Sequence, residues 1–332
     1  MKTRGMRMPF MDVKIDFKSD YIDSLYEHLK SAGWHGSRED EDIELKHANF
    51  LRRNVTAQKR KVFVSRNLKC PKENKEAYNL ILHKILIGEP ITPHLSRNLK
   101  KPEYDDLFLN EWGIHHLHLS TKIEKDGFCE RTECVLLVIF EKDCALVIDI
   151  RPHGKENPTL WVQKSILDII LCSWPEWIDR FRIRNASLQR NVTEQEHLNL
   201  RRGRLNTQVT LSDGNSYIGP GGGITTAGTS MQANMRSDQL HHKIRDFEDD
   251  VKNNINIYKR RFWGDICEWP FFMVIKLHSI GENFYALAAG SNTALGVYVP
   301  WPVDMSDGAR CHMCVIAELR SVPGIYSREF IL

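Results

Sequence analysis

The chain has 332 residues, of which 42% are hydrophobic and 27% charged, and its formal net charge is +3. This composition is typical of a folded globular protein, and the length allows about two domains. The sequence lacks an apolar run of the roughly 20 residues that a membrane span needs, and residues 1–7 are basic without the apolar core of a signal peptide. We therefore expect a cytoplasmic protein with no membrane partner.

The order of the predicted elements indicates an α+β protein, with a central antiparallel sheet core, flanking helices and a second, C-terminal helix-plus-sheet domain. An N-terminal helical and basic region is expected over residues 1–105, and the central antiparallel core over 106–184. A segment rich in Gly, Ser and Thr connects them over 185–231 to a helix with a small antiparallel sheet at 232–332.

The N-terminal region contains two predicted helices and one predicted strand. Residues 18–32 carry an apolar stripe at helical spacing, with Asp20 as a candidate N-cap. Lys61–Ser65 is a short strand, and residues 73–87 repeat the helical spacing. Four glycine and proline residues then predict a loop over residues 88–105.

The centre of the chain contains three predicted strands and a helix. In residues 112–119, three of the 14 histidines of the chain fall within four positions and alternate with apolar residues, which predicts a strand. Successive side chains of a strand point to opposite faces, so His116 and His118 share one face and His115 takes the other. Residues 134–140 and 145–150 then form a hairpin, and a helix with Leu160 and Ile170 follows.

The last third of the chain begins with a glycine cluster at 219–223, which lacks the spacing of a P-loop or a dinucleotide fingerprint. We interpret the cluster as a flexible loop. A helix is expected at about 232–256, with an apolar stripe from Leu240 to Ile255. Four strands are expected to follow it, at 272–277, 284–287, 297–299 and 314–317.

Basic residues are clustered although the net charge is small. Residues 45–72 contain no acidic residue, and a second group of arginines runs from Arg180 to Arg204. Clustered cations suggest a surface that meets phosphates, and nucleic acid, most simply RNA, is the expected partner. The alternative is a solvated surface with acidic neighbours in space. The predicted nucleic-acid-binding residues are Arg52, Arg53, Lys59, Arg60, Lys61 and Arg66.

The central histidines and arginines have the chemistry of a metal-independent ribonuclease. Such an enzyme needs a base for the 2′-hydroxyl, an acid for the leaving oxygen and a cation for the phosphate. His116 and His118 are the expected acid/base pair, Arg131 the phosphate clamp and His153 an auxiliary donor. No cofactor is expected.

The order of the histidine-rich strand, Arg131, the apolar hairpin and then Arg151 and His153 resembles the core of bacterial RelE- and BrnT-type mRNA-interferase toxins. The resemblance covers about residues 108–155. It implies a toxin-like endoribonuclease of a toxin–antitoxin system, with an antitoxin or a regulatory nucleic acid–protein complex as a further partner. Large chains that carry such toxins resemble effectors of bacterial anti-phage systems.

Three alternatives stay open at the level of the sequence. His116 and His118 could bind a metal, with Glu111, Asp149 or His153 as a third ligand. Cys311–Cys314 is half of a zinc-binding pattern, but the sequence has no second CxxC to complete it. The same two histidines could instead be purely structural, and His115, which shares its face with leucines, is expected to be a hydrogen-bonded core histidine. The basic clusters could also bind RNA without cutting it.

Overall fold

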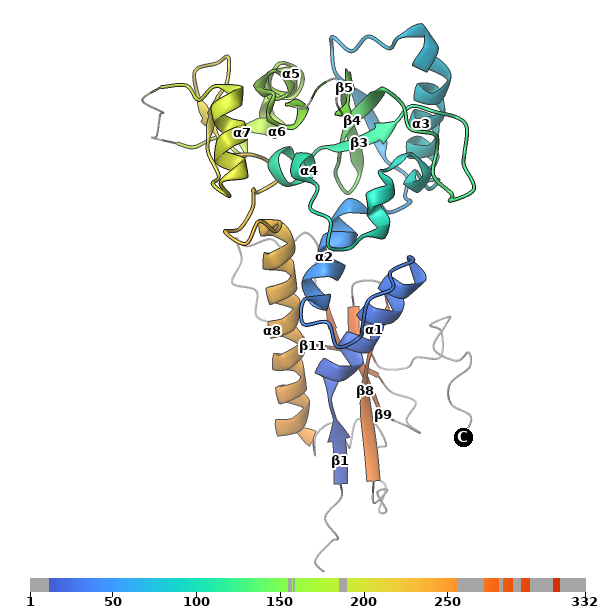
Figure 1. Cartoon of the computed structure of the whole chain (residues 1–332). Coiled ribbons are helices and arrows are strands. Elements are labelled where there is room, and N and C mark those ends of the chain that lie inside the picture. The colour runs from blue at the N-terminus through green and yellow to red at the C-terminus, as the bar shows by residue number, and fades with distance from the viewer. Residues whose placement is uncertain are drawn as a thin grey trace, which may run out of the picture. The chain divides into compact units, whose positions relative to one another are not determined.

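A computed structural model describes residues 12–154, 157, 159–184 and 190–255, together with the strands at 272–280, 283–288, 294–298 and 313–316. The chain divides into two compact units (Figure 1). We call them the terminal unit (Met1–Ser31, Gly36–Ile43 and Asp238–Leu332) and the central unit (Ala32–His35 and Glu44–Ser237). No helix in these described ranges is long and apolar enough to cross a membrane.

This division differs from the expected domains. The N-terminal 105 residues are not one region, because the chain starts in the terminal unit and moves to the central unit after Ile43. Residues 185–231 were expected to connect two domains, yet they belong to the central unit. The sequence pattern identified the longer helices and most of the strands but did not show which distant elements pair.

The terminal unit combines the two ends of the chain. A strand at the beginning, β1, pairs in parallel with β8, and the later strands pair antiparallel in the order β1-β8-β9-β10-β11. The C-terminal antiparallel sheet was predicted, but the addition of β1 was not. The elements are β1 (Asp12–Ile15), α1 (Phe17–Ser31), most of α8 (Met231–Asn253), β8 (Phe272–Ile280), β9 (Asn283–Ala288), β10 (Ala294–Tyr298) and β11 (Met313–Ile316).

Helix α1 packs on α8 and is tied to the sheet. The rings of Phe17 and Phe247 lie 5.2 Å apart, and the Phe17 amide donates to the Glu248 carboxylate at 2.6 Å. Asp20 was predicted to cap this helix. Instead its side chain accepts a hydrogen bond from the Leu277 amide of β8 at 2.9 Å, and Asp16 accepts from the Ser19 amide at the start of the helix.

The central unit is built on a sheet of four strands in the order β2-β5-β4-β3. Strand β2 runs parallel to β5, whereas β5, β4 and β3 are antiparallel. The central sheet is therefore mixed, and the expectation of a purely antiparallel core is wrong at β2. The strands are β2 (Lys61–Val64), β3 (His115–His118), β4 (Cys134–Phe140) and β5 (Cys144–Pro152), with a small pair β6 (Val209–Thr210) and β7 (Ser216–Tyr217) elsewhere in the unit.

Helices and short 3-10 turns surround this sheet. The helices are α2 (Ile43–Arg53), α3 (Lys75–Ile87), α4 (Leu107–Trp112), α5 (Lys164–Ser173), α6 (Pro175–Asp179) and α7 (Glu194–Arg202). The 3-10 turns are Lys72–Asn74, Thr92–His94, Arg97–Lys100 and Leu160–Val162. Helices α2, α4, α6 and α7 were not predicted, because each is short or strongly polar and its buried face is set by tertiary neighbours.

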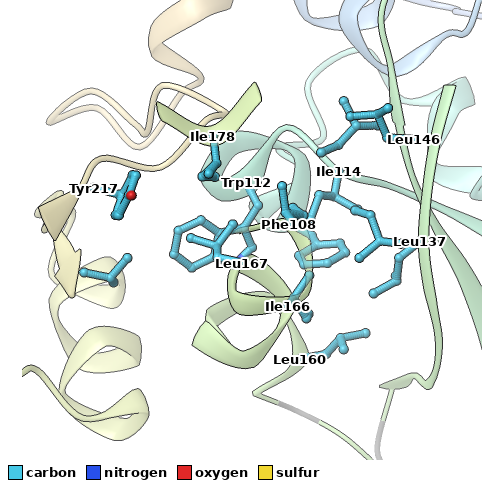
Figure 2. Packing of buried hydrophobic residues seen from close by; sticks show 14 of the residues in the cluster. Phe108, Trp112, Ile114, Leu137, Leu146, Leu160, Ile166, Leu167, Ile178 and Tyr217 are labelled. Carbon is cyan, nitrogen blue, oxygen red and sulfur yellow. The ribbon is translucent and has the colours of Figure 1, made fainter. Parts of the chain in front are cut away.

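One face of the sheet packs on α4 and α5 through a cluster of buried apolar side chains (Figure 2). Trp112 and Ile114 are completely buried in this cluster, and Ile166, Leu167 and Ile170 of α5 line it. Burying a large apolar side chain contributes about 2 kcal/mol, so this cluster is a main source of stability. It also fixes α4 directly before the histidine-rich strand.

The glycine cluster packs against α4 and is not a free loop. The amide of Gly221 donates to the Glu111 carbonyl at 3.1 Å, and the amide of Gly223 donates to the Asn110 carbonyl at 2.8 Å. A Cβ atom on Gly221 would lie 2.2 Å from the Leu109 carbonyl oxygen. The glycines therefore allow two backbones to approach closely and satisfy carbonyls at the end of α4.

We predict that Gly221→Ala lowers the free energy of unfolding by about 3 kcal/mol, because the methyl group overlaps backbone that cannot move alone. Urea titration of the full chain measures the change. Gly203→Ala is the matched control, since its nearest contact would be 3.3 Å and its φ is ordinary. Equal midpoints for the two variants would contradict the close backbone packing.

Candidate histidine site

Helix α4 and the strand β3 are separated by a single glycine turn. Gly113 ends α4 in the left-handed conformation (φ +69°), and its amide donates to the Leu109 carbonyl at 2.9 Å. This conformation favours glycine because it has no Cβ. Strand β3 then begins at His115 and pairs with β4, so that His116 is the cross-strand partner of Leu137 and His118 is the partner of Val135.

A β-bulge in strand β5 changes which side chains face these histidines. Val138 of β4 is paired with Val147, but the preceding Leu137 is paired with Asp149. Ile148 is therefore an extra residue on β5. Because side chains alternate along a strand, one extra residue moves every later side chain to the other face of the sheet.

The bulge brings the end of β5 to the histidine side. Side chains of paired residues lie on the same face of a sheet. Val135 is paired with both His118 and Arg151, so Arg151 lies on the same face as His118. His153 continues this alternation, and its amide donates to the Glu133 carbonyl beside β4 at 2.8 Å. Without the bulge, His153 would point to the opposite face.

Three imidazole rings consequently form one cluster. The ring centroids of His116 and His153 are 5.2 Å apart, those of His118 and His153 are 5.7 Å apart, and those of His116 and His118 are 6.3 Å apart. We call His116, His118 and His153 the histidine cluster. The structure thus places together three of the four predicted catalytic residues, and His153 lies nearer to His116 than His118 does.

His118 is the most enclosed member of the cluster. It is 4% exposed, and its Nδ1 lies 3.4 Å from both the amide and the hydroxyl of Thr132. Burial lowers the pKa of His118 to about 3, with further lowering by positive charge on His116, His153 and Arg131. His118 is therefore neutral at physiological pH and is held in one orientation, which suits it to positioning its neighbours and not to donating a proton.

His153 and His116 are more accessible and differ in their surroundings. Burial, followed by positive charge on His116 and on Arg131, lowers the pKa of His153 to about 4. His116 Nδ1 lies 3.7 Å from the Oδ2 atom of Asp106. The other oxygen of Asp106 accepts hydrogen bonds from the Phe108 and Leu109 amides and so caps α4. Asp106 is thus fixed as a counter-charge for a protonated His116.

Arg131 lies at the edge of the cluster. Its side chain is exposed, and its positive charge is a cause of the lowered pKa of both His118 and His153. Among the described residues no carboxylate forms an ion pair with it. A free guanidinium beside neutral imidazoles favours the binding of an anion.

His115 occupies the opposite face of β3. Its Nε2 lies 3.3 Å from the Arg52 carbonyl oxygen, and its ring meets the Phe140 ring edge-on at 5.4 Å. Burial lowers the pKa of His115 to about 4. The hydrogen bond expected for His115 is present, and its side chain is half-buried.

The three third ligands considered for a metal have different positions. Glu111 is buried in an ion-paired group with His197 and Arg201, and Asp149 is paired with Arg151 at 2.6 Å. His153 alone lies beside His116 and His118. Within the described ranges, no group of three His, Cys, Asp or Glu side chains has the geometry to hold a metal ion. Residues 311 and 312 of the half zinc pattern lie outside those ranges.

Two of the predicted nucleic-acid-binding arginines are internal. Arg53 is 5% exposed, and its guanidinium donates to carbonyls of residues 49, 98, 101 and 102. The guanidinium of Arg52 donates to five oxygen atoms, on Gln232, Asn110, Ser230, Leu109 and Gly221. The guanidinium donors of Arg52 and Arg53 are used within the fold, which argues against the prediction that these residues contact phosphates.

The remaining four predicted residues lie nearer to solvent. Arg60 is half-buried, donates to the carbonyls of residues 141 and 56 and stacks over the Phe140 ring. Lys59, Lys61 and Arg66 are exposed, and none of them forms an ion pair with a described carboxylate. The exposed part of the predicted basic surface is therefore confined to β2 and its flanks.

The second arginine cluster is largely neutralised. Arg180 pairs with Glu141, Arg182 with Asp179, Arg190 with Glu196 and Arg201 with Glu111. The sequence left open the alternative that acidic neighbours in space pair with these arginines. The four ion pairs agree with that alternative.

Two members of the site's surroundings were missed in the sequence. Asp106 precedes an apolar run and could have been identified as a helix N-cap, but its approach to His116 depends on the turn at Gly113. Thr132 carries no distinguishing pattern.

The comparisons with known proteins add no assignment, since no family model matches the chain and neither the curated proteins nor the solved structures yield a match.

We predict that acidification weakens the fold between about pH 6.5 and pH 4. His115, His118 and His153 have folded-state pKa values well below the ordinary 6.5, so in this window the unfolded chain binds more protons than the folded chain. Stability is then fully present above pH 6.5 and falls by about 1.4 kcal/mol per pH unit for each such histidine. Urea titrations at several pH values measure this slope.

The variant His118→Asn tests the contribution of one imidazole, because the amide oxygen can replace Nδ1 as acceptor but does not titrate. The slope should fall by up to about 1.4 kcal/mol per pH unit. His83→Asn, on the exposed side of α3, serves as the control. An unchanged slope in His118→Asn would contradict a buried, neutral His118.

We predict that Arg52→Lys lowers the free energy of unfolding by about 2–4 kcal/mol. An ammonium has three donors in place of five, so buried oxygens lose partners. Arg66→Lys, an exposed exchange of the same kind, should change stability by less than about 0.5 kcal/mol. Similar urea midpoints for both variants would argue against the role of Arg52.

Proposed function

We propose that the histidine cluster and Arg131 form a metal-independent site that cleaves RNA. The observation that carries the proposal is the meeting of three imidazoles within 5.2–6.3 Å beside an exposed guanidinium with no described ion-pair partner. Two imidazoles and a cation are the groups that phosphodiester cleavage by acid/base catalysis needs.

The geometry favours His116 and His153 as the working pair. Their rings are the closest two of the cluster, and both are more accessible than His118. His153, with its lowered pKa, is neutral above about pH 5 and can accept a proton. His116 faces the Asp106 carboxylate, which compensates the charge of an imidazolium. His118, expected to be half of the pair, becomes a positioning residue.

The proposed reaction is an internal displacement at phosphorus. His153 takes the proton of the 2′-hydroxyl, and the 2′-oxygen forms a bond to phosphorus. The bond from phosphorus to the 5′-oxygen breaks, and His116 gives its proton to that oxygen. Arg131 binds the non-bridging oxygens, whose charge grows in the transition state. The products are a 2′,3′-cyclic phosphate and a 5′-hydroxyl.

The resemblance to RelE- and BrnT-type toxins stays a prediction that supports the same reaction class. The resemblance covers about residues 108–155, which include His116, His118, Arg131 and His153, whereas Asp106 lies just before this range. Under this proposal the chain is an RNA-acting effector, and a bacterial toxin–antitoxin or anti-phage system is its setting.

Incubation of the purified full chain with cellular RNA in the presence of EDTA tests the proposal. His116→Ala and His153→Ala should each lower the cleavage rate about 100-fold or more, with RNA binding nearly unchanged. Arg131→Ala should weaken both binding and cleavage. His83→Ala is the matched surface control. Cleavage that survives the loss of both His116 and His153 would refute these roles.

A metal-dependent hydrolase that uses the His-x-His pair is the second candidate, although the three described imidazoles do not have the geometry of a metal site. Cleavage abolished by EDTA and restored by a divalent metal would favour it. RNA that binds but stays intact under both conditions would favour a binding protein. The same assay therefore separates all three functions.

A further inference from the structure

Strand β2 leaves one edge of the central sheet open. It is the last strand in the order β2-β5-β4-β3, and it pairs only with β5 among the described strands. The amide of Lys61 donates to the Asp143 carbonyl just before β5, and the amide of Ser65 donates to the Val147 carbonyl of β5, both at 2.9 Å. Since amide direction alternates along a strand, the Val62 and Val64 amides point away from β5. An edge of this kind is a template for another strand.

Apolar side chains at this edge are exposed on both faces of the sheet. Phe63 is 46% exposed and Val64 is 42% exposed, although the two residues point to opposite faces. The amide of Arg60 donates to the Ile85 carbonyl at 3.1 Å, which places the end of α3 beside the start of β2. There Leu86 and Ile87 are also exposed.

The flanks of this edge are positively charged. Lys59, Lys61, Arg66 and Lys69 are exposed, and residues 45–72 contain no acidic residue. A second copy of the chain is a poor occupant, because antiparallel pairing of β2 with itself about Phe63 would place Arg60 opposite Arg66 and bring the two basic flanks together. The charge instead complements carboxylates.

We propose that the open edge of β2 binds an extended acidic segment of a partner protein as a fifth strand. Backbone hydrogen bonds from the Val62 and Val64 amides would hold the segment. Apolar residues in its middle would cover Phe63 and Val64, and Asp or Glu at its ends would meet the lysines and Arg66. The open amides favour a peptide over RNA, whose recognition does not use a strand edge. The proposal is independent of the proposed ribonuclease activity.

Fluorescence anisotropy of the full chain with a labelled synthetic peptide tests this proposal. The peptide has about eight residues, with alternating valine and threonine between pairs of glutamates. Val64→Pro removes an outward amide without removing a bond to β5, and should weaken binding about tenfold or more. Val64→Thr keeps the amide and should bind normally. Lys61→Glu should weaken binding and its dependence on salt.

Circular dichroism checks that each variant is folded, and Val62→Pro repeats the test at the other outward amide. Equal binding by the proline and threonine variants would overturn the proposal, as would failure of the peptide to bind. Oligouridine serves as a competitor. Three results together would assign the edge to nucleic acid. The RNA would displace the peptide, it would bind Val64→Pro as tightly as it binds the original chain, and it would not bind Lys61→Glu.

Discussion

The guanidinium of Arg52 is the interaction on which the arrangement of the central unit depends. It lies at the end of α2 and donates to side chains or carbonyls of α4, of the glycine cluster and of the start of α8. Burial lowers its pKa to about 10, so the group keeps its charge at neutral pH and needs all of these acceptors. A planar fork of five donors meets oxygens from several segments in a way that no other side chain can.

The position of the histidine site follows from this anchor and from the β-bulge. Arg52 fixes α4, α4 ends at the Gly113 turn, and β3 starts two residues later, so the distance between Asp106 and His116 is set by the packing of one short helix. The extra residue Ile148 then turns His153 toward the same face. The arrangement of the histidine cluster therefore depends on two local features of the sheet, the Gly113 turn and the inserted residue Ile148.

Much of the fold could be predicted from the sequence, and the failures have physical causes. The strand β3, the hairpin and α8 were predicted because their apolar periodicity is strong. The shared face of His116 and His118 is consistent with their ring contact, but the true neighbour of His116 is His153, since a bulge leaves no periodic signal. Clustered arginines were predicted to lie at the surface, yet sequence does not distinguish an arginine that binds phosphate from one that binds carbonyls, as Arg53 does.

The two edges of the central sheet have different properties, and this difference bears on the proposed binding of a further strand. On the β3 edge, the His118 carbonyl accepts a hydrogen bond from His94 Nδ1 at 3.1 Å, which uses an outer group and blocks the addition of a strand. That edge is thus closed by protein while its side chains meet the end of β5. On the β2 edge, the outward amide of Arg60 just before the strand is bonded to the Ile85 carbonyl, but no described group accepts from the outward amides of Val62 and Val64. A bound strand there would be separated from β3 by β2, β5 and β4, and so could stabilise the sheet without covering the histidine cluster.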